Sequence, residues 1–205
     1  MRRVIAMTAI AAVVSTAAAA QIPGLRPSIY VGADYQHSTI TWEDFHLPTV
    51  PPTTINGSQL FAHTFSGAHL HVGARLGSMF GIELGYMWLP EQDKVIGGGN
   101  NSSLAVQGVT LDGMVYVPLD ATANFELIGL VGGAFLEGTA KLNGPSFGNI
   151  VDVDPDWSWR AGGGAQYRLS RNLNVRGMVT WQGAKFDGEV DHALNVNIGL
   201  NYLFN

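Results

Sequence analysis

Apolar and polar positions alternate along most of the chain after residue 26. In residues 193–204, for example, every second side chain is apolar and the others are small or polar. A period of two puts successive side chains on opposite faces of a β-strand. The pattern therefore predicts eight strands, at residues 28–36, 67–76, 81–88, 105–117, 125–136, 157–169, 175–182 and 193–204. The fifth is apolar on both faces, so its facing is left open.

The connections between these strands alternate in length. The long ones cover about residues 38–66, 90–102, 137–156 and 183–191, and the short ones residues 77–79, 118–123 and 170–173. Short periplasmic turns and longer outer loops are typical of bacterial membrane barrels, whose strands turn an apolar face to lipid. A soluble β-sandwich has no physical reason to place its long connections at one end and its short connections at the other. We therefore predict an all-β fold, an eight-stranded antiparallel up-and-down transmembrane barrel with its long loops outside.

Aromatic residues gather near the two ends of the predicted strands. Rings are expected where hydrocarbon meets lipid headgroups, so two belts are predicted. The outer belt contains Trp42, Trp88, Trp157, Trp159 and Trp181, and the inner belt contains Phe80, Phe125, Tyr167, Tyr202 and Phe204.

The first twenty residues have the layout of a secretory signal. Arg2 and Arg3 precede an apolar stretch from Val4 to Val14, and small residues at 18–20 offer a cleavage site. We expect residues 1–20 to be a signal peptide and residues 21–205 to form the barrel domain, with the new N-terminus in the periplasm. A membrane anchor is the alternative, but the apolar stretch is short for a full span.

Composition narrows the possible functions. After removal of Arg2 and Arg3 the chain has nine Lys and Arg residues against sixteen Asp and Glu, which gives no support to nucleic-acid binding. There is no cysteine, so no disulfide framework holds the fold together. The region after the signal has no apolar run of eighteen residues, which excludes a helical membrane protein.

Strand parity turns charged side chains of both signs into the barrel. The predicted lumen network contains Asp34, Arg75, Glu83, Asp112, Arg160, Arg168 and Arg176. Glu126 joins it if Phe125 faces lipid. Because an eight-stranded barrel is narrow, we expect paired charges to fill the lumen, with Arg75 pairing with Glu83 across the first short turn. A selective pore lined by these charges is the alternative.

Two sequence patterns are compatible with metal binding, but neither establishes a metal site. His69 and His71 share the lumen face of one strand, but no third ligand is evident opposite them, so we interpret them as polar filler. Two predicted outer loops are acidic, and clustered carboxylates suit Ca²⁺ or Mg²⁺. The weak candidates are Asp152, Asp154, Asp156, Asp187, Glu189 and Asp191. A solvated acidic rim is the favoured interpretation of these residues, so we expect no metal and no cofactor.

Catalysis is the remaining alternative. A lipid-A-modifying enzyme needs a nucleophile, a histidine and an acid converging on the lipid-facing wall. His192 can meet Asp191, but no serine accompanies them, so no catalytic residues are assigned.

Residues 27–205 resemble the small outer-membrane barrel-domain family that includes opacity-type surface proteins and OmpA-like transmembrane barrels, a porin-family group. The resemblance lies in WSWRAGGGAQYRLSRNLNVRGMVTWQ and in the closing strand NVNIGLNYLF, although Asn205 follows the terminal aromatic residue. It implies a Gram-negative outer-membrane location, contact with lipid and lipopolysaccharide, and barrel-insertion machinery that recognises the last strand. We therefore expect a non-enzymatic surface protein that has an envelope role or contacts a host or phage. A small, weakly conducting porin is the alternative.

Overall fold

The computed structural model describes residues 28–42, 44–47, 53–97, 100–143, 151–183 and 190–204. The predicted signal peptide lies outside these ranges. Among the residues described, no helix combines the length and the apolar character needed to cross a membrane.

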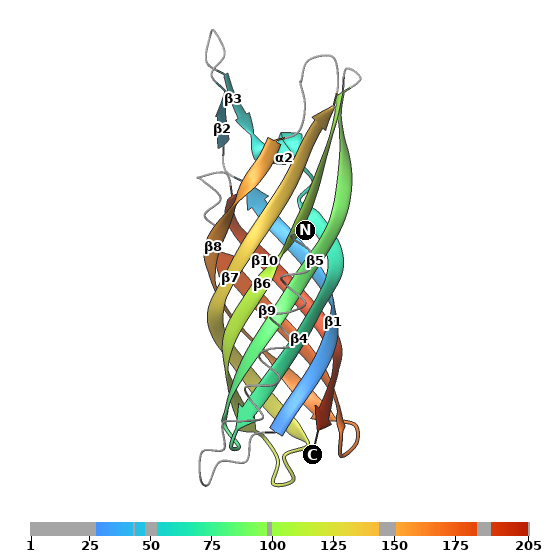
Figure 1. The fold of residues 1–205 in the computed structure, drawn as a ribbon, viewed down its shortest axis with the longest axis vertical. Helices are drawn as coiled ribbons and strands as arrows, with labels where there is room; N and C mark the ends of the chain where they lie inside the picture. Colours follow the sequence, from blue (N-terminus) through green and yellow to red (C-terminus); the bar gives the residue numbers. More distant parts are fainter. Residues whose placement is uncertain are drawn as a thin grey trace, which may run out of the picture.

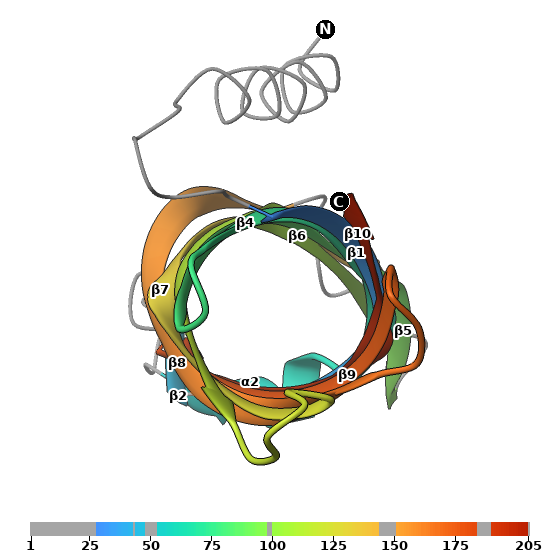
Figure 2. The same cartoon turned by 90° about the horizontal axis from the view of Figure 1, so that it is seen from below.

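Eight antiparallel strands form a closed barrel, as predicted (Figures 1 and 2). Each strand pairs with its neighbours in the chain order, and β1 pairs with both β4 and β10, which closes the wall. The strands are β1 (Ser28–Trp42), β4 (Thr64–Leu76), β5 (Phe80–Gly97), β6 (Asn100–Pro118), β7 (Phe125–Asn143), β8 (Val151–Arg168), β9 (Leu173–Gly183) and β10 (Val190–Phe204).

Alternation along each strand separates an apolar outer wall from the lumen. In β10, Ile198 is 62% exposed, whereas the neighbouring Asn197 is 3% exposed. The facing of β7, which the sequence left open, is also settled. Phe125 and Leu127 point outward, while Glu126 and Ile128 are buried in the lumen. Both faces of β7 are apolar because Ile128 packs inside the barrel against buried side chains of other strands.

Three short turns lie at one end of the barrel, called here the turn end. They are residues 77–79, 119–124 and 169–172. Gly77 has a φ of 75°, a left-handed conformation that glycine adopts without the clash a Cβ would cause. The turn end also carries the C-terminal end of β10 (Figure 1).

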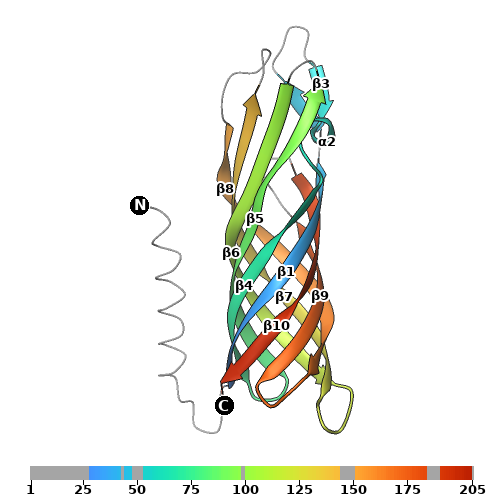
Figure 3. The ribbon, with the colours of Figure 1, turned by 90° about the vertical axis from the view of Figure 1, so that its right-hand side faces the viewer.

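At the opposite end, the α2 end, the strands continue farther than the alternation predicted. The expected loops 90–102 and 137–156 are largely strand, because β5 to β8 remain paired beyond the body of the barrel (Figure 3). Proline is uncommon inside a paired strand because it has no N–H for the ladder. The register between β7 and β8 shifts between Leu136 and Gly138, and Pro155 lies at this irregularity without a paired residue in β7. It therefore does not need to donate a backbone hydrogen bond to the neighbouring strand.

A small subdomain lies at the α2 end, in what was expected to be a loop at 38–66. It consists of the hairpin β2 (Asp44–Leu47) and β3 (Thr53–Asn56), followed by the one-turn helix α2 (Gly57–Leu60). Leu60 and Phe61, together with Phe65 of β4, pack into a buried apolar cluster with inward residues of other strands of the barrel wall. These wall residues are Ile40, Met87, Leu89, Leu104, Val106, Ala134, Leu136, Ala140 and Val190.

Polar contacts fix α2 to the wall. The Lys94 ammonium donates to the backbone carbonyls of Ser58 and Phe61, and the Ser102 hydroxyl donates to the carbonyl of Leu60. Among the described residues, an apolar core therefore occupies the interior of the barrel at the α2 end.

Candidate functional site in the barrel lumen

Below the apolar core, the lumen contains a buried polar network. Four carboxylates and three guanidinium groups are buried here among the described residues. They are Asp34, Glu83, Asp112, Glu126, Arg75, Arg160 and Arg176. Strand parity predicted all of these as lumen residues except Glu126, whose placement depended on the facing of β7.

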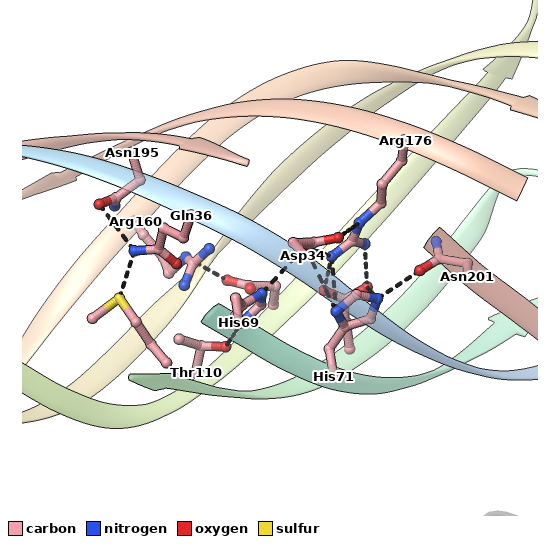
Figure 4. A network of polar contacts seen from close by, with 12 residues as sticks. Asp34, Gln36, His69, His71, Thr110, Arg160, Arg176, Asn195 and Asn201 are labelled. Atoms are coloured by element: carbon pink, nitrogen blue, oxygen red, sulfur yellow. Dashed lines mark hydrogen bonds and ion pairs between the residues drawn. The ribbon is translucent and has the colours of Figure 1, made fainter. Parts of the chain in front are cut away.

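Arg176 of β9 is the centre of the network (Figure 4). Its Nη2 lies 2.6 Å from Asp34 Oδ2, and its Nη1 lies 2.7 Å from Glu83 Oε2. Tyr30 donates its hydroxyl hydrogen to the same Glu83 carboxylate at 2.9 Å, and the Tyr30 and Tyr116 hydroxyls lie 3.0 Å apart. One guanidinium thus links β1, β5 and β9 across the lumen.

The predicted Arg75–Glu83 pair does not form. Arg75 instead makes a two-pronged ion pair with Glu126 of β7, at 3.0 and 2.9 Å, and its guanidinium lies 4.1 Å from the Tyr116 ring centre. The prediction assumed that partners would lie on neighbouring strands. In a narrow barrel a long side chain reaches across the lumen, so Arg75 finds a carboxylate three strands away.

Asp112 and Arg160 form the third charged pair. Arg160 Nε lies 3.2 Å from Asp112 Oδ1, but the groups are poorly aligned for a hydrogen bond, so the contact is mainly electrostatic. Arg168, the remaining predicted member, is half-buried at the turn end and makes no ion pair with any described residue.

The two lumen histidines have a third polar partner that the sequence analysis missed. Asp34 lies opposite His69 in the β1–β4 register, and its carboxylate contacts His69 Nδ1 at 3.5 Å and His71 Nδ1 at 3.7 Å. The three residues are buried and bring their ligand atoms together. The register between 28–36 and 67–76 was the signal that could have identified Asp34.

Little free space remains between these side chains. Two cavities of about 10 Å³ each lie in the lumen, one beside His69 and Arg176 and the other beside Tyr30 and Arg75. Each is about the size of one water molecule. Among the described residues, side chains therefore occupy most of the lumen at the level of the network.

Most of the predicted belt residues lie exposed on the outer wall. Near the α2 end these are Trp88, Trp157, Trp159 and Trp181, and near the turn end Phe80, Phe125, Tyr167, Tyr202 and Phe204. Trp42 is different. It shares the inward parity of Ile40, its ring lies 5.3 Å from that of Phe61, and its Nε1 donates to the Ala62 carbonyl. Trp42 therefore belongs to the apolar core at the α2 end.

The six acidic residues predicted on outer loops are not seen together as one cluster among the described residues. Asp152, Asp154 and Asp156 lie in β8, because β7–β8 pairing extends to Val151. Asp191 lies in β10, where its carboxylate is 2.8 Å from His192 Nδ1. Asp187 and Glu189 lie outside the described residues.

The structure also brings a hydroxyl to the Asp191–His192 pair. Thr41 Oγ1 lies 3.2 Å from His192 Nε2, and Trp181 stacks on the histidine ring with centroids 5.5 Å apart. Thr41 and His192 are cross-strand partners in the β1–β10 ladder, where such contacts between side chains are common.

Comparison with known proteins identifies a family model. Residues 6–204 match the model described as "Outer membrane protein beta-barrel domain". No curated protein matches the chain.

Several solved structures have the same fold. Neisserial surface protein A is 11% identical, with a TM-score of 0.61 over 87% of this chain and 99% of that protein. The attachment invasion locus protein Ail of Yersinia pestis, solved with the heparin analogue sucrose octasulfate, is 15% identical, with a TM-score of 0.53 over 88% and 99%. OprG of Pseudomonas aeruginosa is 10% identical, with a TM-score of 0.51 over 87% and 96%. At these identities the likeness shows a shared fold.

Proposed function

The chain belongs to the outer membrane protein β-barrel domain family, and on that premise we propose that it is a closed, non-catalytic surface barrel whose role is structural or contact-making. The barrel stiffens the envelope, and the α2 end presents the contact surface. Transport through the lumen is not its function.

The filled lumen is the observation that carries this proposal. A solute passing from the turn end would meet the Arg75–Glu126 pair, the Arg176 network and then the apolar core around Phe65. Opening this path would separate buried opposite charges, which is costly because each charge is left uncompensated. An eight-stranded barrel has no space to move such groups aside.

The difference between the two ends of the barrel supports an orientation for it in the membrane. Bacterial barrels place short turns in the periplasm and larger structures outside, so the α2 end faces outward and the turn end faces the periplasm. The longest strands have 19 residues, which at usual rise and tilt span roughly 45 Å along the barrel axis. The apolar band of such barrels is about 25 Å tall. β5 to β8 therefore raise the α2 end roughly 20 Å above the lipid.

The chemistry of the α2 end favours some partners over others. Asp93 and Glu137 are exposed there, as is Glu91, which is paired with Lys141, and the sequence of β8 adds further acidic residues at this end. Ail was solved with a sulfated heparin analogue, but a polyanion would be repelled by this surface. A cationic partner, or lipopolysaccharide phosphate reached through divalent ions, suits it better. The closing strand β10 is the segment that insertion machinery would engage.

Planar-bilayer recording tests the closed lumen. Purified, refolded protein is expected to give no steady channels, while a porin of known conductance reconstituted in parallel shows that insertion can be detected. Steady channels whose conductance changes in Arg160→Ala or Asp112→Ala would overturn the proposal in favour of a small porin.

Cysteine labelling tests the orientation. The chain has no cysteine, so Ser58→Cys in α2 and Ser78→Cys in a short turn each introduce one reactive thiol. A membrane-impermeant maleimide added to intact cells should label position 58 but not position 78. Position 78 should be labelled only after the outer membrane is permeabilised. The reverse pattern would show that the α2 end faces the periplasm.

A further inference from the structure

From the arrangement of Asp34, His69 and His71, we propose that the lumen contains a binding site for one divalent transition-metal ion of the zinc type. The three side chains project into the lumen from the paired strands β1 and β4, on the turn-end side of the apolar core. It is independent of whether the protein has an envelope or a contact role.

The spacing of the ligand atoms suits such an ion. Asp34 Oδ2 lies 3.5 Å from His69 Nδ1 and 3.7 Å from His71 Nδ1. Zinc binds histidine nitrogen and carboxylate oxygen at about 2.0–2.2 Å in a tetrahedron, which puts neighbouring ligand atoms roughly 3.3–3.6 Å apart. All three ligand atoms lie within 4.8 Å of one another, so side-chain adjustments of about 1 Å would bring them onto one ion and leave the fourth position for water.

The second contacts of the two histidines keep their Nδ1 atoms directed at the site. His71 Nε2 lies 2.6 Å from Asn201 Oδ1, and His69 Nε2 lies 3.1 Å from Thr110 Oγ1. When Nε2 carries the proton and donates it to these oxygens, the Nδ1 lone pair is free to bind a metal. Hydrogen bonds of this kind orient histidine ligands in known metal sites.

Glycines on adjacent strands make room for these histidines. A Cβ built at Gly32 would lie 2.1 Å from His71 Nε2, and one at Gly85 would lie 2.2 Å from His69 Nε2. Any larger residue at either position would push a ring away from its present place. The wall is thus shaped around the two imidazoles.

The site already attracts positive charge. Arg176 Nη2 lies 2.6 Å from Asp34 Oδ2 and 3.1 Å from His71 Nδ1, so a guanidinium nitrogen takes the place of the ion. The buried lumen still has four carboxylates for three guanidiniums. An arriving ion would displace Nη2, while Nη1 keeps its 2.7 Å contact with Glu83. Because the apolar core lies on one side of the site and the Arg75–Glu126 pair on the other, we expect loading to accompany folding of the barrel.

Refolding in the presence of metal tests the site. Wild-type protein refolded from denaturant into detergent with Zn²⁺ should retain about one ion per chain after desalting, measured by mass spectrometry of the metal, as expected for a three-ligand site. With Co²⁺ it should show the intense visible absorption of a four-coordinate ion. A metal-free wild-type protein, or a six-coordinate Co²⁺ spectrum, would overturn the proposal.

Matched variants locate the ion. His69→Gln with His71→Gln should abolish retention, whereas His37→Gln with His192→Gln, which alters two histidines outside the lumen, should leave it unchanged. Thr110→Val should weaken Zn²⁺ binding roughly tenfold by removing the partner of His69. Thr180→Val, which removes a buried hydroxyl without a hydrogen-bond partner, should not. Equal retention across these variants would overturn the placement of the ion.

Discussion

The Arg75–Glu126 pair offers a sharp test of how the lumen contributes to stability. The two side chains are 11% and 5% exposed and form two parallel contacts near 3 Å. Arg75→Met removes the guanidinium and keeps most of the side-chain volume. Glu126→Gln removes the charge and keeps an acceptor for Gln166, which donates to Glu126.

The expected magnitudes follow from burial. Breaking a buried ion pair by removing one partner costs about 3–5 kcal/mol, because the remaining charge is left without compensation. Arg75→Met also loses the contact with the Tyr116 ring, which adds about 1–2 kcal/mol. The double variant leaves neither charge buried alone. It should therefore be destabilised by about 2–3 kcal/mol less than the sum of the single variants, which is the coupling energy of the pair.

Reversible urea unfolding of the protein in lipid vesicles, followed by tryptophan fluorescence, measures these free energies. Arg168→Met is the control, since Arg168 is half-buried at the turn end and has no ion pair with a described residue. It should change stability by less than about 1 kcal/mol. If the effects of Arg75→Met and Glu126→Gln simply add, the pair does not act as a unit and the reasoning is refuted.

Three further predictions concern the lumen, the apolar core and the projecting strands. Gly85→Ala should cost about 1–3 kcal/mol because its Cβ would clash with His69, whereas Gly129→Ala, which meets nothing within 4 Å, should be nearly neutral in the same unfolding assay. Phe65→Ala should cost about 3–5 kcal/mol yet leave bilayer recordings silent, because the charged network still closes the lumen; new channels would show that the core alone seals it. The Ser103 hydroxyl and the Lys141 ammonium hold the pKa of Glu91 below its ordinary 4.5. Any stability difference between wild type and Glu91→Gln should therefore be present above pH 4.5 and lost as the pH falls through the lowered pKa, and a difference that grows on acidification would contradict this.

Much of the fold follows from the sequence because the alternation is a local property. A period of two fixes which side of a strand faces lipid, and it predicted the burial of Asp34, Glu83 and Asp112. The same rule failed to assign β7. An apolar residue such as Ile128 can face lipid or an apolar part of the lumen, and only the packed barrel shows that Met114 and Met178 lie opposite it.

Contacts across the lumen could not be predicted in the same way. The partner of Arg75 depends on the stagger of strands around the whole wall, which no local pattern encodes. Trp42 was placed by its position near a strand end, although its parity matched that of Ile40. The third member of the Asp34–His69–His71 group needed the register between β1 and β4 to be known, and the sequence alone left it undetermined.

The unequal strand lengths have one more consequence. In the body of the barrel every strand is paired on both sides, but within the described residues positions 151–158 of β8 pair with β7 alone. An open strand edge is a template for joining another chain. Here that edge carries the run Asp152-Val153-Asp154-Pro155-Asp156. A strand of this sequence is a poor partner for an identical strand, because its repeated negative charges would repel each other and its proline has no N–H to offer.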